Sequence, residues 1–194
     1  MSDSWDDYAG EWDANIDAIY YSEKAYESLI REVDIEDKII LDFGCGTGLL
    51  TEKLATLAKC IIAIDASTKM IAVLESKNLH NVIPIAENLT LELINSNSAF
   101  TKHFDIVVAS SVFSFLPDYE STLNLLKSQL ISGGILIQWD WLSSEDNAQF
   151  GLSETTIRKT LGDTGFKQIV ITRPFSITNE KGMMPVVMGV AKNA

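Results

Sequence analysis

The stretch ILDFGCGTGLL, residues 40–50, decides the fold. An apolar run that includes one acid ends in a turn where Gly44, Gly46 and Gly48 alternate with other residues. Glycine permits unusual backbone angles, and its missing Cβ lets a ligand approach the backbone. A helix that opens directly after such a turn also points backbone N–H groups toward a ligand. The stretch therefore predicts a strand, a tight ligand-binding turn and a helix.

Short apolar, β-rich runs recur along the chain and alternate with stretches of helical periodicity. The helical stretches follow the first, second, fourth and fifth runs, with apolar residues spaced along 49–57, 70–74, 123–131 and 157–161. Alternating strands and helices predict right-handed crossovers and a sheet covered on both faces. We therefore expect an α/β, doubly wound, Rossmann-like sheet of seven mostly parallel strands, with helices on both faces. The expected strands are 38–43, 60–65, 81–86, 104–110, 134–140, 167–173 and 185–191.

The two ends of the chain depart from this alternation. About eleven residues, 174–184, separate the last two expected strands, and they carry Pro and Gly without helical periodicity. Because a crossover to a parallel strand needs about a dozen residues or more, the last strand should be antiparallel, joined by a long hairpin loop. Before the first strand, two helical patterns are expected, and Trp5, Tyr8 and Trp12 share one face of the first. We expect one domain over 1–194, with 1–37 as a helical lid or cap and 38–194 as the Rossmann-like core.

Composition narrows the class of protein. The 194 residues suffice for one domain with a full core. The net charge of −12 predicts repulsion from nucleic acid and from anionic lipid, so neither is an expected partner. No run is long enough for a membrane helix, and the acidic start does not resemble a secretory signal. Cys45 and Cys60 form no disulfide framework and no metal spacing, which favours reduced thiols in the cytoplasm. The oligomeric state is not predicted.

A second feature specifies the ligand of the turn. Asp65 ends the second expected strand, 17 residues beyond Gly48. An acid at that point can accept hydrogen bonds from both hydroxyls of a ribose. The turn reads G-x-G-x-G, and Leu49 stands where a dinucleotide fingerprint has its third glycine. This spacing disfavours a pyrophosphate cofactor, and the turn and acid together predict a nucleoside site.

Four segments, taken together, resemble the motifs of class I S-adenosylmethionine-dependent methyltransferases. ILDFGCGTGLLTEKLA (40–55) is similar to their glycine-rich motif, and IIAIDASTKMI (61–71) to their second-strand motif. FDIVVASSVFSFLPD (104–118) resembles their fourth strand and the loop after it, and LISGGILI (130–137) resembles the turn into their fifth strand. The resemblance runs in order from about residue 38 to 140. It implies S-adenosylmethionine as cofactor and methyl transfer as activity.

The resemblance also implies roles for single residues. The glycines would lie against the methionine part of the cofactor, Asp42 would hold its amino group, and Asp65 would bind the ribose. Met70 or Ala66 would pack on adenine, and the carbonyl of Ser110 would lie near the methionine amine. The third-strand motif of relatives often ends Asp-Ala, and the acid of this pair contacts the adenine amino group. If Ala86 matches the alanine, Ile85 stands where the acid would be; in a shifted register, Glu87 is the acid. We favour contact with adenine by Ala86 and Glu87. The implied cofactor-binding residues are Asp42, Gly44, Cys45, Gly46, Gly48, Asp65, Ala66, Met70, Ala86, Glu87 and Ser110.

Few residues are candidates for acid–base chemistry. His80 and His103 precede the third and fourth strands and so stand at the wrong end of the sheet. Asp140 follows the fifth strand at the carboxyl end, where it would orient or deprotonate an acceptor. Relatives often carry histidines after strand four, whereas Ser114 and Phe115 stand there in this chain. The predicted walls of the substrate pocket are Tyr8, Trp12, Phe113, Phe115, Trp139 and Trp141.

The sequence therefore predicts a methyltransferase that acts on a small-molecule acceptor, since no basic groove or added domain is recognisable. Two alternatives stay open. One is a non-catalytic module that binds S-adenosylmethionine, which the missing loop histidines suggest. The other is an NAD(P)-dependent oxidoreductase on a related sheet, which the glycine spacing disfavours. No metal is expected.

Overall fold

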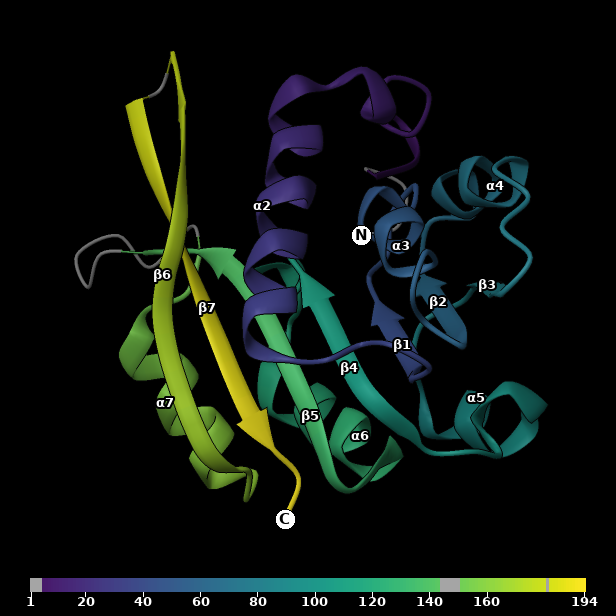
Figure 1. The fold of residues 1–194 in the computed structure, drawn as a ribbon, viewed down its shortest axis with the longest axis vertical. Coiled ribbons are helices and arrows are strands. Elements are labelled where there is room, and N and C mark those ends of the chain that lie inside the picture. The colour runs from purple at the N-terminus through teal and green to yellow at the C-terminus, as the bar shows by residue number, and fades with distance from the viewer. Residues whose placement is uncertain (1–4, 144–150, 181) are drawn as a thin grey trace.

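The computed structural model describes residues 5–143, 151–180 and 182–194 and contains one seven-stranded sheet (Figure 1). The strand order is β3-β2-β1-β4-β5-β7-β6. The neighbours from β3 to β5 pair in parallel, whereas β7 is antiparallel to both β5 and β6. This confirms the predicted mostly parallel sheet with an antiparallel last strand. The strands are β1 (Ile39–Phe43), β2 (Cys60–Asp65), β3 (Val82–Ala86), β4 (Phe104–Ser110), β5 (Leu130–Trp141), β6 (Lys167–Asn179) and β7 (Gly182–Lys192).

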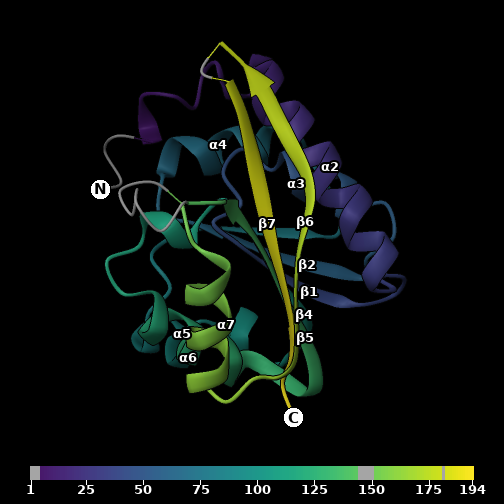
Figure 2. The same cartoon turned by 90° about the vertical axis from the view of Figure 1, so that its left-hand side faces the viewer.

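Helices cover both faces of the sheet, as the view along its edge shows (Figure 2). One apolar core lies between the sheet and α2 (Ile16–Glu32), α3 (Leu49–Leu54) and α4 (Thr68–Ser76). The other lies between the sheet and α5 (Leu91–Ser96), α6 (Tyr119–Gln129) and α7 (Glu154–Asp163). The central strands are buried on both faces, which explains why their sequences are apolar nearly throughout. Short 3-10 turns are η1 (Trp12–Ala14), η2 (Ser98–Phe100) and η3 (Phe113–Phe115).

The last two strands form a longer hairpin than the sequence suggested. Their pairing continues from Phe175↔Val186 to Asn179↔Gly182, so the predicted long loop over 174–184 is wrong. A register shift between Thr172 and Phe175 accommodates Pro174, which has no N–H to donate to a neighbouring strand. The hairpin extends past the strands of the central sheet at the top of Figure 1.

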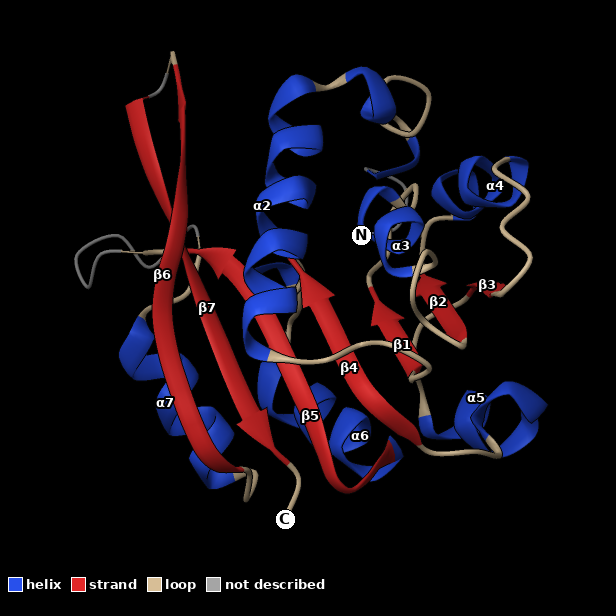
Figure 3. Cartoon of the chain, viewed as in Figure 1, coloured by secondary structure: helices blue, strands red, loops and turns tan. Residues whose placement is uncertain are grey.

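The N-terminal region also differs from the prediction. The second helical stretch and the end of the first form one helix, α2, which crosses in front of the sheet (Figure 3). Its N-cap is Asn15, whose side chain accepts hydrogen bonds from two backbone N–H groups of the first turn. Trp5, Tyr8 and Trp12 do not share one continuous helix, because turns and η1 interrupt it. Their rings still gather, with centroids 5.8–6.5 Å apart.

Two smaller differences concern helix α5 and strand β5. Helix α5 was not predicted, because six residues are too few for a clear helical period. Strand β5 runs from Leu130 to Trp141 rather than from 134 to 140, so Asp140 lies inside the strand and not at its end. Within the described ranges, no helix combines the length and apolarity that crossing a membrane requires.

Candidate functional site

The glycine turn joins β1 to α3 at the carboxyl edge of the sheet, where open α/β sheets bind ligands. Gly44, Gly46 and Gly48 all have left-handed φ values, +70°, +55° and +85°. An added Cβ would lie 2.4 Å from a side-chain atom of Val112 at Gly44 and of Leu74 at Gly48, whereas nothing lies within 4 Å of the place a Cβ would take at Gly46. The space beside Gly46 is therefore open to a ligand.

Asp65 holds this turn from the end of the next strand. One carboxylate oxygen accepts the N–H of Gly46 at 2.9 Å, and the other accepts the N–H of Ser67 at 2.8 Å. Partial burial raises the pKa of Asp65, and these two hydrogen bonds oppose that rise. A carboxylate oxygen can accept two hydrogen bonds, so each oxygen of Asp65 can still accept one from a hydroxyl donor. The carboxylate can thus order the turn and bind a ribose.

Asp42 is the second-to-last residue of β1, just before the turn, and is 1% exposed. Its carboxylate accepts the Thr51 hydroxyl at 2.7 Å. Burial raises its pKa to about 7, and the charge of Asp65 adds to the rise. Burial likewise raises the pKa of the neighbouring Cys45 thiol. A buried acid beside the turn is suited to a cationic group such as an ammonium.

The end of β3 lies beside the end of β2. Ala86 pairs in register with Asp65, so the two side chains share one edge. Ile85 is buried, whereas Glu87 follows the strand and is exposed, which makes Glu87 the carboxyl group available here. Met70 is only 2% exposed and is packed in the core beneath α4.

Two further predicted cofactor residues lie at the same edge of the sheet. Ala66 directly follows β2 and is partly exposed. Ser110 ends β4, pairs with Trp139 and is also partly exposed. The edge therefore brings together backbone or side chains from the ends of four neighbouring strands.

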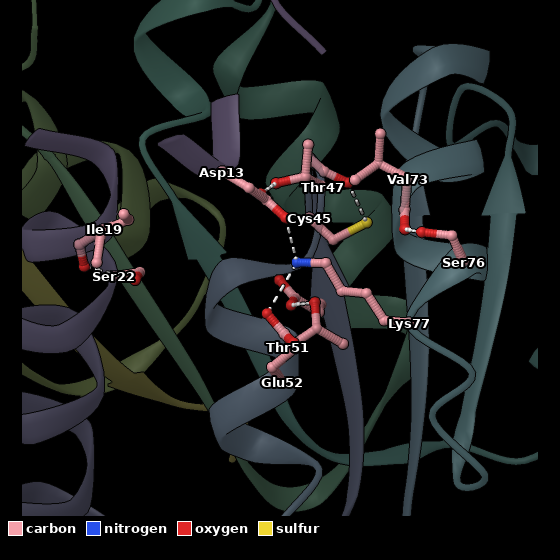
Figure 4. A network of polar contacts seen from close by, with 12 residues as sticks. Asp13, Ile19, Ser22, Cys45, Thr47, Thr51, Glu52, Val73, Ser76 and Lys77 are labelled. Carbon is pink, nitrogen blue, oxygen red and sulfur yellow. Dashed lines mark hydrogen bonds and ion pairs between the residues drawn. The ribbon is translucent and has the colours of Figure 1, made fainter. Parts of the chain in front are cut away.

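The N-terminal segment is anchored to this edge by acidic side chains. Asp13 accepts the hydroxyl of Thr47, inside the glycine turn, at 2.5 Å, and it also pairs with Lys77 at 2.8 Å (Figure 4). Lys77 simultaneously pairs with Glu52 of α3 at 2.8 Å. The sequence did not reveal this network, because it joins residues 13, 47, 52 and 77 through tertiary structure.

A second anchor of the N-terminal segment lies next to Asp65. Asp6 accepts the Ser67 hydroxyl at 2.5 Å, and this bond lowers the pKa of Asp6. The ring of Trp5 meets that of Phe115 edge-on at 5.3 Å between centroids, so the segment also reaches the loop after β4. Tyr8 is 57% exposed and Trp12 is partly exposed. The segment from Trp5 to Asp13 thus lies across the carboxyl edge, where a lid would lie.

Two predicted pocket walls are core residues instead. Phe113 is 1% exposed and packs against the rings of Phe43 and Tyr119. Trp139 is fully buried, and its indole N–H donates to the Ser28 hydroxyl at 2.9 Å. Both side chains therefore serve packing between the sheet and its helices.

Asp140 is buried completely within β5. Its carboxylate accepts the backbone N–H of Ser114 at 3.1 Å and the side-chain amide N–H of Gln138 at 3.2 Å. Burial raises its pKa to about 7, against the effect of these hydrogen bonds. Trp141, next along the strand, contacts the ring of Tyr21 at 5.2 Å between centroids. Tyr21 was not predicted, because its helix lies 120 residues earlier in the chain.

Other candidates for acid–base or metal chemistry lie outside this edge. His80 and His103 are both exposed and precede β3 and β4, as expected. Tyr20 and Lys24 have the Tyr-x-x-x-Lys spacing of some nicotinamide-dependent oxidoreductases, but the ammonium lies over the phenol ring on the outside of α2. Among the described residues, no group of three or more His, Cys, Asp or Glu side chains is arranged to hold a metal.

Residues 41–136 match a family model described as a methyltransferase domain. Over 126 residues the chain is 32% identical to an uncharacterized methyltransferase of Schizosaccharomyces pombe, covering 62% of this chain and 44% of that protein. Over 112 residues it is 32% identical to a ubiquinone biosynthesis O-methyltransferase of Paramagnetospirillum magneticum, covering 57% of this chain and 43% of that protein. The matched part thus spans less than half of the length of either relative.

Solved structures share the fold over nearly the whole chain. The structure described as a DhpI–SAM–HEP complex has a TM-score of 0.75, covers 97% of this chain and 94% of that one, and is 18% identical. Magnesium protoporphyrin IX methyltransferase from Synechocystis PCC 6803 has a TM-score of 0.66, covers 90% and 80%, and is 20% identical. The motifs, the family model and the shared sheet agree. The chain belongs to the class I S-adenosylmethionine-dependent methyltransferases.

Proposed function

We propose that this protein binds S-adenosylmethionine at the glycine turn and transfers its methyl group to a small-molecule acceptor. The observation that carries the proposal is the pair formed by Gly46 and Asp65. An open space lies beside a left-handed glycine, and the carboxylate that fixes this glycine belongs to the end of the adjacent strand. A nucleoside with a ribose near the acid and its 5′ substituent near the turn fits this arrangement.

The residues of the edge take defined roles in this proposal. Asp65 holds the ribose, Ala66 and Ala86 flank adenine, and Glu87 accepts from the adenine amino group. Asp42 and the carbonyl of Ser110 hold the methionine amine, Gly44, Cys45 and Gly48 shape the turn, and Met70 supports it from below. The segment from Trp5 to Asp13 acts as a lid that excludes water.

When bound, the cofactor would supply an activated methyl group to the lone pair of the acceptor, with the sulfonium sulfur as the leaving group. The protein mainly brings the acceptor close and in line, which can contribute roughly 7–11 kcal/mol. The acceptor's proton then passes to Asp140, a buried carboxylate with a pKa raised to about 7.

A small acceptor is favoured by the charge of the chain. Names of relatives include malonyl-[acyl-carrier protein] O-methyltransferase from Halalkalibacterium halodurans and ribosomal RNA small subunit methyltransferase A from Mesomycoplasma hyopneumoniae. With a net charge of −12, this chain is poorly suited to hold RNA. Its two cysteines are both free, which suits the reducing cytoplasm.

Isothermal titration with S-adenosylhomocysteine, with NAD as control ligand, tests the cofactor assignment. We expect micromolar binding of S-adenosylhomocysteine alone, and binding at least about tenfold weaker for Asp65→Ala, with an unchanged far-ultraviolet circular dichroism spectrum. Heat with NAD only, or unchanged affinity in the variant, would overturn the assignment. Conversion of S-adenosylmethionine to S-adenosylhomocysteine with a pool of cell metabolites separates an enzyme from a non-catalytic binding module.

A further inference from the structure

Two buried hydroxyl groups near the carboxyl end of β5 lack hydrogen-bond partners among the residues that the structure describes. Tyr21 is 6% exposed, and its hydroxyl oxygen makes no hydrogen bond. Ser111 lies close enough to lower the pKa of this phenol but does not reach hydrogen-bond geometry. The Ser114 hydroxyl is likewise buried and reaches no hydrogen-bond geometry with a described residue, although it lies close enough to Asp140 to lower the pKa of that carboxyl. Because nearly all buried polar groups in proteins are paired, two such groups near each other mark a place where a polar ligand or a water molecule can bind.

The carboxylate of Asp140 belongs to the same group of side chains. The backbone N–H of Ser114 donates to Asp140, which places residue 114 directly beside the acid. The Tyr119 hydroxyl donates to Gln138, whose side-chain amide donates to Asp140. The charge of Asp140 also raises the pKa of Tyr21 and Tyr119. Side chains from η3, β5 and α6 thus surround the acid, and the Tyr21 phenol of α2 lies within range of its charge.

This acid has no cationic partner in the part of the chain that the structure describes. Its pKa is set by burial and by hydrogen bonds from Ser114 and Gln138, with no contribution from a lysine or arginine. A ligand with a carboxylate or phosphate would bring a second negative charge into this poorly solvated place. A ligand with an N–H or O–H group, neutral or cationic, would instead pair with Asp140.

The surroundings of Tyr21 favour a flat apolar body for the same ligand. The rings of Trp141 and Phe175 both meet the Tyr21 ring at 5.2 Å between centroids. Ring edges and faces of this kind attract other aromatic rings and organic cations.

We propose that the methyl acceptor is a neutral or cationic molecule with an aromatic body, which donates an N–H or O–H group to Asp140 and accepts from the Tyr21 hydroxyl. Anionic acceptors, whose reacting group is a carboxylate or phosphate, are rejected. This inference rests on the proposed function, because it assigns the acceptor side of the same site.

Binding of three matched probes to protein saturated with S-adenosylhomocysteine tests the proposal. The probes are phenethylamine, phenethyl alcohol and phenylacetate, and the measurement is a dissociation constant from ligand-observed NMR at about pH 8, where Asp140 is mostly ionised. We expect the amine and the alcohol to bind at least about tenfold more tightly than phenylacetate. Equal or tighter binding of phenylacetate, or binding of no probe, would overturn the proposal.

Two variants connect the preference to the named residues. Asp140→Asn should remove most of the discrimination between the amine and phenylacetate. Tyr21→Phe should weaken the binding of phenethyl alcohol by about fivefold to tenfold. Its thermal midpoint should be unchanged or higher, because the Tyr21 hydroxyl makes no hydrogen bond with a described residue that the change would remove. Asp118→Asn removes one exposed carboxylate that caps α6 and should change neither result.

Failure of this inference and failure of the proposed function give different results. If the wild-type protein does not bind S-adenosylhomocysteine, the cofactor assignment itself is wrong. Normal S-adenosylhomocysteine binding together with wild-type discrimination in Asp140→Asn, or wild-type alcohol binding in Tyr21→Phe, would overturn only the acceptor assignment.

Discussion

The backbone N–H of Gly46 donates to the carboxylate of Asp65 at 2.9 Å, so the end of β2 fixes the turn that follows β1. The same turn is held from the outside by Asp13, through the hydroxyl of Thr47. The side chains of Asp65 and Asp13 thus restrain two consecutive positions of one loop, Gly46 and Thr47. A turn restrained in this way is already in a binding conformation before a ligand arrives, which lowers the entropy cost of binding.

Gly46→Ala should separate ligand binding from stability. The left-handed φ of +55° costs alanine roughly 1–2 kcal/mol of folding stability, but the added Cβ meets no protein atom within 4 Å. It does occupy the space assigned to the cofactor. We expect at least about tenfold weaker binding of S-adenosylhomocysteine by calorimetry.

Gly182→Ala is the matched control for this change. Gly182 also has a positive φ, +104°, and also has no atom within 4 Å of an added Cβ, but it lies at the start of β7. The Gly182→Ala variant should be destabilised to a similar degree as Gly46→Ala and should bind S-adenosylhomocysteine with unchanged affinity. Equal affinity in Gly46→Ala and Gly182→Ala would mean that the cofactor does not lie beside Gly46.

The glycine turn and Asp65 could be predicted because their positions follow from local order: each directly follows a strand, and parallel strands end at one edge. Tyr21 and the Asp13–Lys77 pair could not be predicted, since their contacts depend on how α2 and the N-terminal segment cross the sheet. Asp140 was predicted at the right edge, but no sequence pattern revealed its complete burial. Trp139 was expected in a pocket because aromatic residues suit both pockets and cores, and only packing distinguishes the two.

The Asp13 contacts should control how long the cofactor stays bound. Asp13→Asn weakens the ion pair with Lys77 and the bond from Thr47, both of which hold the N-terminal segment over the turn. We expect S-adenosylhomocysteine to dissociate about twofold to tenfold faster, because lid opening often limits ligand release. Stability should fall by less than about 1 kcal/mol, since the pair is partly exposed. Stopped-flow tryptophan fluorescence measures the dissociation rate.

Glu52→Gln provides the control, because it removes the other partner of Lys77 without touching the N-terminal segment. Its dissociation rate should match that of the wild type. If Glu52→Gln accelerates release as much as Asp13→Asn does, the effect arises from Lys77 or α4 and not from the lid.

Phe113 and Phe115, two residues apart, should behave differently. Phe113 is buried against Phe43 and Tyr119, so Phe113→Ala should cost about 3–5 kcal/mol of unfolding free energy. Phe115 is partly exposed and contacts Trp5 of the N-terminal segment, so Phe115→Ala should cost less stability and should speed cofactor release. Urea denaturation and the stopped-flow assay distinguish them. A larger stability loss for Phe115→Ala would contradict the assignment of Phe113 to the core.

Asp140 should make the protein less stable as the pH rises. Its pKa is raised from 3.8 in the unfolded reference to about 7 in the folded protein, so the folded state binds more protons between these values. The unfolding free energy therefore falls as the pH increases through this window, and the loss is complete above about pH 7. In Asp140→Asn this loss is absent, while the amide oxygen still accepts the N–H of Ser114. Relative to the wild type, the variant should gain on the order of a few kcal/mol between about pH 4 and 8, as measured by urea denaturation.

Asp118→Asn should show the opposite sign. Hydrogen bonds from Ser121 lower the pKa of Asp118, so its ionised form stabilises the fold above the unfolded pKa, and this contribution is lost as the pH falls. The variant should therefore lose stability relative to the wild type as the pH rises above about 4.

For Asp140, parallel pH profiles of the wild type and Asp140→Asn would contradict the prediction, because they would show that Asp140 stays ionised across the range. The carboxylate would then be a weak base, unsuited to accept a proton from an acceptor near neutral pH.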